Sequence, residues 1–238
     1  IAQVLSRLTY NSSLSHLRRI NTPIEKSSKL VAPRKLHNSQ CMYICSCETP
    51  EGGSVGVVKN LALSCHVTGY SDVSIVNNIL LESQGVVEII NKTPSELRSY
   101  YKILVNGDWR FATNKPKFLV YKLKHLKRVA ILHIHTSIVW KIMDKKIEIY
   151  TDAGRCTRPL YIVNNNKLNI NNDHLHKIDS GLIGWKNLIN GSLNIKDQTN
   201  PGITQGVIEF IDVQEEDECL IAVNKKRLDK KDKHNRIY

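Results

Sequence analysis

The sequence predicts an α+β protein that combines helices with small antiparallel sheets. Two turn signals between β-rich runs, Asn106-Gly107 and Asp144-Lys145, indicate hairpins. Leucines at helical spacing after Asn114 indicate an amphipathic helix. Strands and helices do not alternate in the regular order that a parallel sheet of βαβ units requires. The strands are therefore expected to pair mainly as antiparallel neighbours.

Composition and charge are those of a basic, globular chain. The 238 residues carry a formal net charge of +12, and 41% are hydrophobic. No apolar run approaches the roughly 18 residues of a membrane-spanning helix. Residues 1–65 carry eight basic against three acidic side chains, residues 66–150 thirteen against seven, and residues 151–238 thirteen against twelve. This bias suits a surface that contacts phosphates, and a merely solvated basic surface is the alternative.

The N-terminal region predicts two helical stretches. Apolar residues at positions 1, 4, 5 and 8 have the spacing of a helix with one buried face. A break is expected at residues 11–13, after which Leu14 and Leu17 share one face of a second helix. The chain begins without Met and without the features of a signal peptide, so we expect a fragment of a longer protein.

The second of these stretches carries candidate ligand contacts. At about 100° per residue, His16 and Arg19 point away from the leucine face. Arg18 lies nearer that face and is either a ligand contact or a cover for the core. Residues 22–33 have a proline near each end and a Ser-Ser centre, which predicts an exposed hairpin or loop. Residues 56–67 are apolar and form a buried segment, either strand or helix.

The middle of the chain contains clear boundary signals. Thr93 and Glu96 have the spacing of a capping box, with proline at the first helical position. The Asn106-Gly107 pair predicts a two-residue hairpin turn. The helix after Asn114 turns its leucines inward, and its basic residues are expected outside, on a solvated face: Lys117, Lys122, Lys124, Lys127 and Arg128.

The last third predicts further short strands. Residues 206–213 and 218–223 read as a hairpin across a turn at residues 214–217. Residues 164–173 form a polar loop, and the charged residues 224–238 are expected to lack regular structure. Asp152 and Arg155 are interpreted as a buried structural pair rather than as catalytic groups.

Common catalytic and metal-binding motifs are missing from the sequence. It contains no glycine-rich phosphate loop, no serine-hydrolase elbow and no zinc-protease motif. The six cysteines include no C-x-x-C pair, which favours free thiols packed as small apolar groups over a zinc site and agrees with a reducing compartment. The chain therefore predicts a scaffold around an active site contributed by another protein, with no catalytic residue and no metal ligand of its own.

Four blocks resemble a known family. They are LSRLTYNSSLSHLRRINTP, PRKLHNSQCMYICSCETPEGGSVGVVKNLAL, YTDAGRCTRPLYIV and GVIEFIDVQEEDECLIA. In this order they are similar to consecutive blocks of the second-largest, β-type subunit of multisubunit DNA-directed RNA polymerases. The hairpin at residues 106–109 is also similar to the family's. The resemblance is to the eukaryotic, archaeal or large-DNA-virus type and covers most of the chain.

The resemblance implies a domain order within a multi-lobed polymerase fragment. Residues 1–68 would form the fork domain, 69–146 the external 1 domain and 147–202 the external 2 domain. Residues 203–224 would return as strands to the fork, and 225–238 would be a charged linker or tail. These boundaries follow from the resemblance together with the change in composition after residue 70.

The resemblance also implies a nucleic-acid contact surface. The histidine and arginines of the helical stretch would lie near the RNA–DNA hybrid, and the loop at residues 24–33 would face downstream DNA. Sequence-independent phosphate contacts of this kind weaken as salt rises. The candidate nucleic-acid-binding residues are His16, Arg18, Arg19, Lys26, Lys29, Arg34 and Lys35.

An acidic turn stands out in this basic region. Pro50 fixes φ and Gly52 relieves the exit of the turn, which holds Glu48 and Glu51 in place beside Thr49. The resemblance puts these carboxylates near arginines that contact the incoming nucleotide, where they would orient charge without taking a proton. From the residues alone, a simple structural turn is the alternative.

The resemblance extends to cofactor, partners and location. In the assembled enzyme Mg²⁺ would be held mainly by the largest subunit, and this fragment would bind none. The expected partners are the largest and other polymerase subunits, template DNA and the RNA transcript, with no membrane. The expected location is the nucleus, or the host cytoplasm or virion for a large DNA virus. A free-standing basic nucleic-acid-binding module and an inactive relict polymerase are the alternative functions.

Overall fold

The computed structural model describes residues 2–24, 30–191, 205–228 and 236–237. The chain divides into two compact units, residues 1–66 and residues 67–238. Each unit is described separately below. The mixed α+β class is confirmed, and the domain boundaries implied by the resemblance stay predictions.

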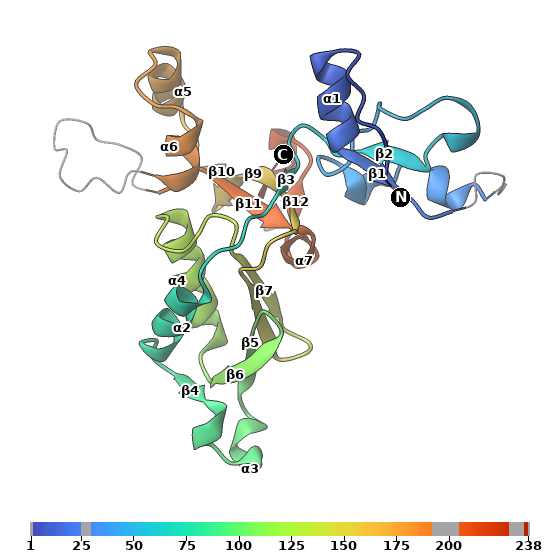
Figure 1. The fold of residues 1–238 in the computed structure, drawn as a ribbon. Coiled ribbons are helices and arrows are strands. Elements are labelled where there is room, and N and C mark those ends of the chain that lie inside the picture. The colour runs from blue at the N-terminus through green and yellow to red at the C-terminus, as the bar shows by residue number, and fades with distance from the viewer. Residues whose placement is uncertain (1, 25–29, 192–204, 229–235, 238) are drawn as a thin grey trace. The chain divides into compact units, whose positions relative to one another are not determined.

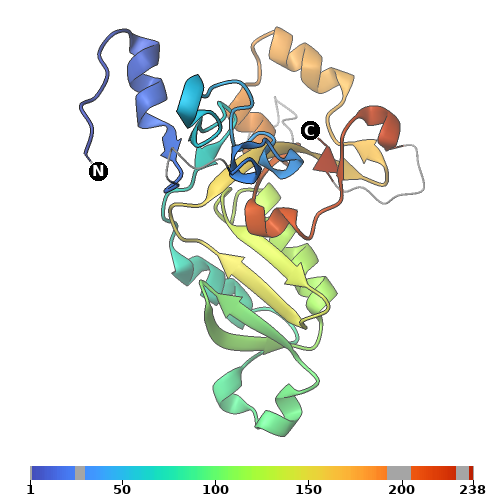
Figure 2. The same cartoon turned by 90° about the vertical axis from the view of Figure 1, so that its right-hand side faces the viewer.

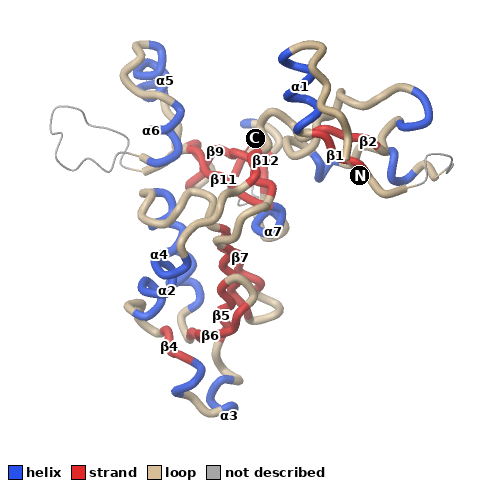
Figure 3. Tube along the Cα trace, in the orientation of Figure 1, coloured by secondary structure: helices blue, strands red, loops and turns tan. Residues whose placement is uncertain are grey.

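Unit 1 consists mainly of loops, drawn in tan in Figure 3, around a short two-stranded sheet. Strand β1 (Arg19–Asn21) pairs antiparallel with β2 (Val58–Asn60). Helix α1 (Tyr10–Leu17) precedes β1. The described residues between the strands include the 3-10 helices η1 (Ala32–Arg34), η2 (Asn38–Gln40) and η3 (Gly52–Ser54).

The helix predicted over residues 1–8 is absent from residues 2–8, and Val4 is 94% exposed. Helix α1 instead runs through the predicted break at residues 11–13 because Thr9 caps it, accepting a hydrogen bond from the Ser12 N–H at 3.1 Å. The leucine face is not buried either, since Leu14 and Leu17 are exposed. A short apolar pattern does not stabilise a helix without a surface to cover it.

Unit 2 contains a five-stranded sheet in the order β4-β6-β5-β8-β7. Only the β5–β8 pairing is parallel within it. The strands are β4 (Val86–Glu88), β5 (Tyr101–Val105), β6 (Asp108–Thr113), β7 (Ser137–Lys141) and β8 (Lys146–Tyr150). Strand β3 (His66–Val67) lies at the division between the units, and η4 (Ile89–Asn91) and α3 (Pro94–Leu97) connect β4 to β5.

Helices α2 (Val73–Leu81) and α4 (Pro116–Arg128) cover one side of this sheet (Figures 1 and 2). Their buried leucines, among them Leu80 and Leu119, share a core with strand residues such as Phe111 and Ile149. Burying a side chain of this size contributes about 1.5–3 kcal/mol. A hydrophobic core of the described part of unit 2 therefore lies between α2, α4 and the sheet.

The local boundary signals in this region are confirmed. Asn106 and Gly107 have φ values of 50° and 88° and close the β5–β6 hairpin. Thr93 donates its backbone N–H to Glu96 at 3.0 Å as the capping box of α3 requires. The β7–β8 hairpin also forms at the expected turn, where Lys145 has a φ of 51°.

A second sheet is built around the long strand β9 (Cys156–Asn164). It pairs antiparallel with β10 (Lys167–Leu168), β11 (Ile208–Asp212) and β13 (Arg236–Ile237). β13 also pairs in parallel with β12 (Ile221–Ala222). The remaining elements are α5 (Asn172–Asp179), α6 (Trp185–Asn190), α7 (Val213–Glu216) and η5 (Lys225–Arg227).

Three expectations for unit 2 are wrong. The hairpin across residues 214–217 is replaced by α7, because Asp212 accepts the Glu215 N–H at 2.8 Å and caps a helix there. The polar loop at 164–173 contains β10 and the start of α5. The described part of the charged tail contains η5 and β13.

None of the described helices is long and apolar enough to span a membrane.

Candidate functional site

The acidic turn is held by its threonine. Thr49 donates its hydroxyl to the Val58 carbonyl at 3.0 Å and accepts the Gly56 N–H at 2.9 Å. These two bonds tie the turn to the start of β2. Gly52 adopts a φ of +80° at the exit, as predicted, a conformation that L side chains rarely adopt. The turn is therefore built with defined geometry.

Arg34 supports the same turn from the other side. Its Nη1 donates to the carbonyls of Gly53 at 2.7 Å and Val55 at 2.9 Å. At Gly56, where φ is +68°, an added Cβ would lie 2.2 Å from the Arg34 carbonyl oxygen. The close approach requires glycine at this position. The structure thus places Arg34, predicted as a nucleic-acid contact, within the internal hydrogen bonds of the turn.

The turn also contacts helix α1. The Ser15 hydroxyl donates to Glu48 Oε1. Glu48 and Glu51 are both exposed, and neither forms a salt bridge with another described residue. The structure therefore brings the helix and the acidic turn together and leaves both carboxylates accessible. Sequence reasoning missed Ser15, since nothing local identifies a partner 33 residues away.

His16 and Arg18 make contacts within unit 1. His16 Nδ1 accepts the Ser6 N–H at 3.0 Å, and its Nε2 lies 2.9 Å from Gln3 Oε1. Arg18 Nη2 donates to the carbonyls of Ala62 at 2.7 Å and Cys65 at 3.0 Å. Of the two interpretations of Arg18, these bonds favour a structural cover.

The other candidate contacts divide into two groups. Arg19 and Lys35 are exposed, and neither side chain is ion-paired to a described residue. They are cations on the surface of unit 1 that phosphates can reach. Lys26 and Lys29 lie outside the described residues.

Unit 2 contains a buried charge cluster that the sequence did not predict. Lys127, expected outside, is only 3% exposed. Its Nζ donates to the Phe210 carbonyl at 2.8 Å and lies 3.2 Å from Glu215 and 3.5 Å from Glu209. Arg128 pairs with the same Glu209 at 3.2 Å. The correction has a physical reason, because a buried ammonium needs carboxylate partners and these come from β11 and α7.

Arg155 forms a second set of ion pairs in unit 2. It pairs with Asp152 at 2.7 Å and with the buried Asp212 at 2.8 Å. It also donates to the His135 carbonyl at 2.9 Å. The expected Asp152–Arg155 pair is present, but Asp152 is half-exposed and the buried partner is Asp212. Partial desolvation, and then the Arg155 charge, lower the pKa of His133, although the residue is exposed at the surface.

The last candidate groups are possible metal ligands and the cysteine thiols. No group of three His, Cys, Asp or Glu side chains in the described part of the chain could hold a metal ion. Cys65 is buried, whereas Cys41 and Cys47 are exposed. The exposed pair differs from the expectation that the thiols pack as small apolar groups.

Comparison with known proteins places these features in a family. Three family models match in order: RNA polymerase Rpb2, domain 3, over residues 3–67, domain 4 over residues 103–164, and domain 5 over residues 203–238. The chain is 42% identical to DNA-directed RNA polymerase II subunit RPB2 of Encephalitozoon cuniculi, over 96% of this chain and 19% of that protein.

Other relatives agree. Identity is 39% to DNA-directed RNA polymerase II subunit 2 of Arabidopsis thaliana, over 94% of this chain and 18% of that protein. It is 31% to DNA-directed RNA polymerase III subunit RPC2 of Drosophila melanogaster, over 100% of this chain and 20% of that protein. The chain therefore belongs to the family of second-largest DNA-directed RNA polymerase subunits. It spans about a fifth of the length of these relatives.

Proposed function

We propose that this chain is the fork and external region of a DNA-directed RNA polymerase subunit, and that it scaffolds the active centre during RNA synthesis from ribonucleoside triphosphates. The observation that carries the proposal is the joining of helix α1 to an ordered acidic turn whose carboxylates are exposed. The family relationship supports the reaction class.

In this proposal Glu48 and Glu51 orient arginines that contact the incoming nucleotide. Thr49, Pro50 and Gly52 set the direction of the two carboxylates, because they fix the backbone that carries them. A carboxylate that is held in place pairs with a guanidinium by strong charge-assisted hydrogen bonds. Ordered charge of this kind stabilises phosphoryl transfer without a proton passing through the carboxylate.

Contacts to the RNA–DNA hybrid and downstream DNA are assigned to the exposed cations. Arg19 and Lys35 are accessible for phosphate contacts, and Lys26 and Lys29 are retained as candidates by the resemblance. His16, Arg18 and Arg34 are bonded within unit 1, so their part in binding would be to hold the surface in shape.

The partners are the largest subunit, other polymerase subunits, template DNA and the RNA transcript. The largest subunit would hold most ligands of Mg²⁺, which neutralises phosphate charge in phosphoryl transfer. The eukaryotic polymerase II and III relatives support a nuclear location.

The test replaces Glu48 or Glu51 by Ala in the assembled polymerase. We expect the elongation rate at subsaturating nucleotide to fall about tenfold, equivalent to about 1.4 kcal/mol of transition-state stabilisation. Subunit composition should stay unchanged. The matched control is Glu82→Ala, which removes an exposed carboxylate at the end of α2. Dissociation of the subunit with unchanged kinetics of the remaining enzyme would refute the proposal.

A further inference from the structure

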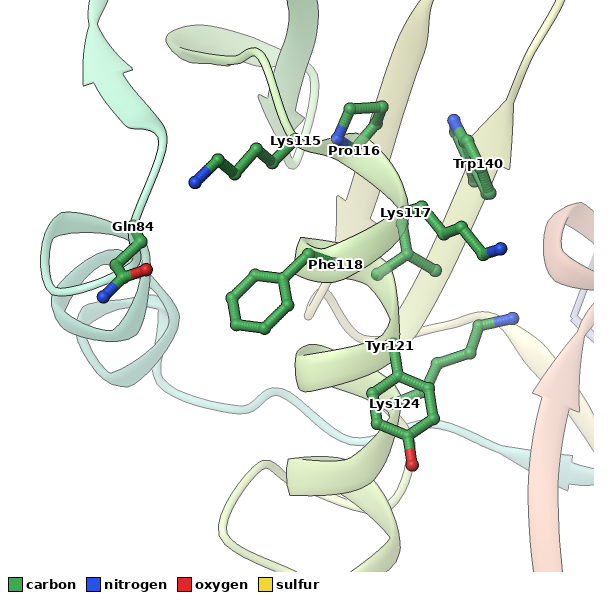
Figure 4. Close-up of a pocket in the computed structure, with 9 residues that line it drawn as sticks. Gln84, Lys115, Pro116, Lys117, Phe118, Tyr121, Lys124 and Trp140 are labelled. Carbon is green, nitrogen blue, oxygen red and sulfur yellow. The ribbon is translucent and has the colours of Figure 1, made fainter.

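Helix α4 carries an exposed aromatic groove in unit 2 (Figure 4). Its volume is about 820 Å³. We define the α4 groove by six of its lining residues: Lys115, Lys117, Phe118, Tyr121, Lys124 and Trp140. The groove belongs to unit 2, whereas the acidic turn belongs to unit 1.

Two of the three aromatic residues of the groove are exposed on α4, whereas Trp140 on β7 is half-buried. Phe118 is 52% exposed and Tyr121 is 74% exposed, although the opposite face of α4 buries Leu119 and Leu123 completely. Residues three apart on a helix are neighbours, so the two rings lie on one face. Single exposed apolar residues are common, whereas a contiguous patch with a polar rim marks an interaction site.

The rim of the groove is positively charged. Lys115 and Lys117 are exposed, and neither forms an ion pair with a described residue. Lys124 is partly committed, because its Nζ lies 3.5 Å from Glu215. The first turn of α4 has no acidic residue to offset the positive end of the helix dipole. The rim therefore favours an occupant with carboxylates.

We propose that the α4 groove binds a short acidic segment of a partner protein, which inserts an aromatic or leucine side chain between Phe118, Tyr121 and Trp140. The apolar floor supplies the anchor site, and the two uncommitted lysines pair with flanking carboxylates. A single-stranded nucleic acid fits less well. Such ligands need a longer row of cations along the phosphates than two lysines provide.

Binding is tested on the assembled polymerase with a defined probe. The probe is a fluorescein-labelled synthetic peptide in which one phenylalanine and one leucine alternate with aspartates and glutamates. At about 0.1 M salt we expect the double change Phe118→Ser with Tyr121→Ser to raise its Kd about tenfold, as loss of anchor contacts does. Lys115→Glu with Lys117→Glu should raise the Kd by a similar factor.

Matched controls change the same residue types elsewhere in unit 2. Tyr70→Ser alters an exposed tyrosine, and Lys186→Glu reverses an exposed lysine on α6, so both should leave the Kd unchanged. Peptides whose anchors are replaced by serine, or whose acids are replaced by amides, should bind about tenfold more weakly. Each polymerase variant must keep its subunit composition and elongation rate.

Three results would overturn the proposal. The first is an unchanged Kd in both double variants. The second is tighter binding of an oligouridylate than of the peptide, lost in the same variants, which would make the groove a nucleic-acid site. The third is protection of Phe118 and Tyr121 from hydroxyl-radical footprinting in the polymerase without peptide, since another part of the enzyme would then cover the groove. None of these depends on the elongation defect expected for Glu48 or Glu51.

Discussion

The two units use their charged residues in opposite ways. In unit 1, Glu48 and Glu51 are exposed on a turn that the Thr49 and Arg34 side chains hold by hydrogen bonds to backbone groups. In unit 2, Lys127 and Glu215 are buried against each other at 3.2 Å. The first arrangement leaves the carboxylates accessible to a ligand or partner. In the second, the carboxylates are paired with lysine or arginine inside the fold.

Burial and ion pairing, rather than the number of charged residues, therefore distinguish charges that serve binding from charges that stabilise the fold. A buried ion is retained only with partners, so the cluster around Lys127 has little capacity to bind anything else. An exposed carboxylate on a fixed backbone lowers the stability of the fold little, because it stays hydrated. Its oxygens remain able to accept hydrogen bonds from a ligand or partner. We therefore infer that the acidic turn serves binding, while the buried cluster holds α4 to β11 and α7.

The largest expected effect follows from removing the centre of the buried cluster. Lys127→Met should destabilise unit 2 by about 3–5 kcal/mol, because it leaves Glu209 and Glu215 buried with reduced compensation. Urea unfolding followed by circular dichroism measures the loss. The matched control, Lys186→Met, changes an exposed lysine and should stay within about 0.5 kcal/mol. Equal stability of the two variants would show that the cluster is not structural.

A smaller effect is expected in unit 1. Thr49→Val keeps the shape of the side chain but removes the bonds to Gly56 and Val58, which should cost about 0.5–1.5 kcal/mol for each bond. Glu48→Gln in the same turn should change the free energy of unfolding by less than about 0.5 kcal/mol. The expected pattern is a stability loss for Thr49 and a kinetic loss for Glu48. A larger stability loss for Glu48→Gln would break the comparison between the units.

Local features were predictable from the sequence because their causes are local. The Asn106-Gly107 turn and the Thr93–Glu96 capping box depend on residues within a few positions of one another. The positive φ of Gly52 belongs to the same class. The functional roles of Glu48 and Glu51 came only from family resemblance and stay predictions.

Features set by distant partners were missed. Lys127 meets Glu215 across 88 positions, so the helical pattern alone assigned it to solvent. Helix α1 begins after Thr9, whose side chain accepts a hydrogen bond from a backbone N–H of the first turn. This cap outweighs the apolar spacing of the preceding residues. The helix after Asp212 has a local signal, since Asp212 and Glu215 have capping-box spacing, and here the cap outweighs the β propensity of the flanking residues.

The smallest expected effect is a pH dependence at the edge of the buried network. Partial desolvation and the Arg155 charge lower the pKa of the exposed His133 from its ordinary value of 6.5. The unfolded chain therefore takes up the proton first as pH falls, and the stability contribution is lost from about pH 6.5 down to the lowered pKa. His133→Gln should flatten the pH dependence of the unfolding free energy in this window. In Arg155→Gln, the pKa of His133 measured by NMR should rise, because the positive charge that helps to lower it is removed. An unchanged pKa would mean that desolvation alone lowers it.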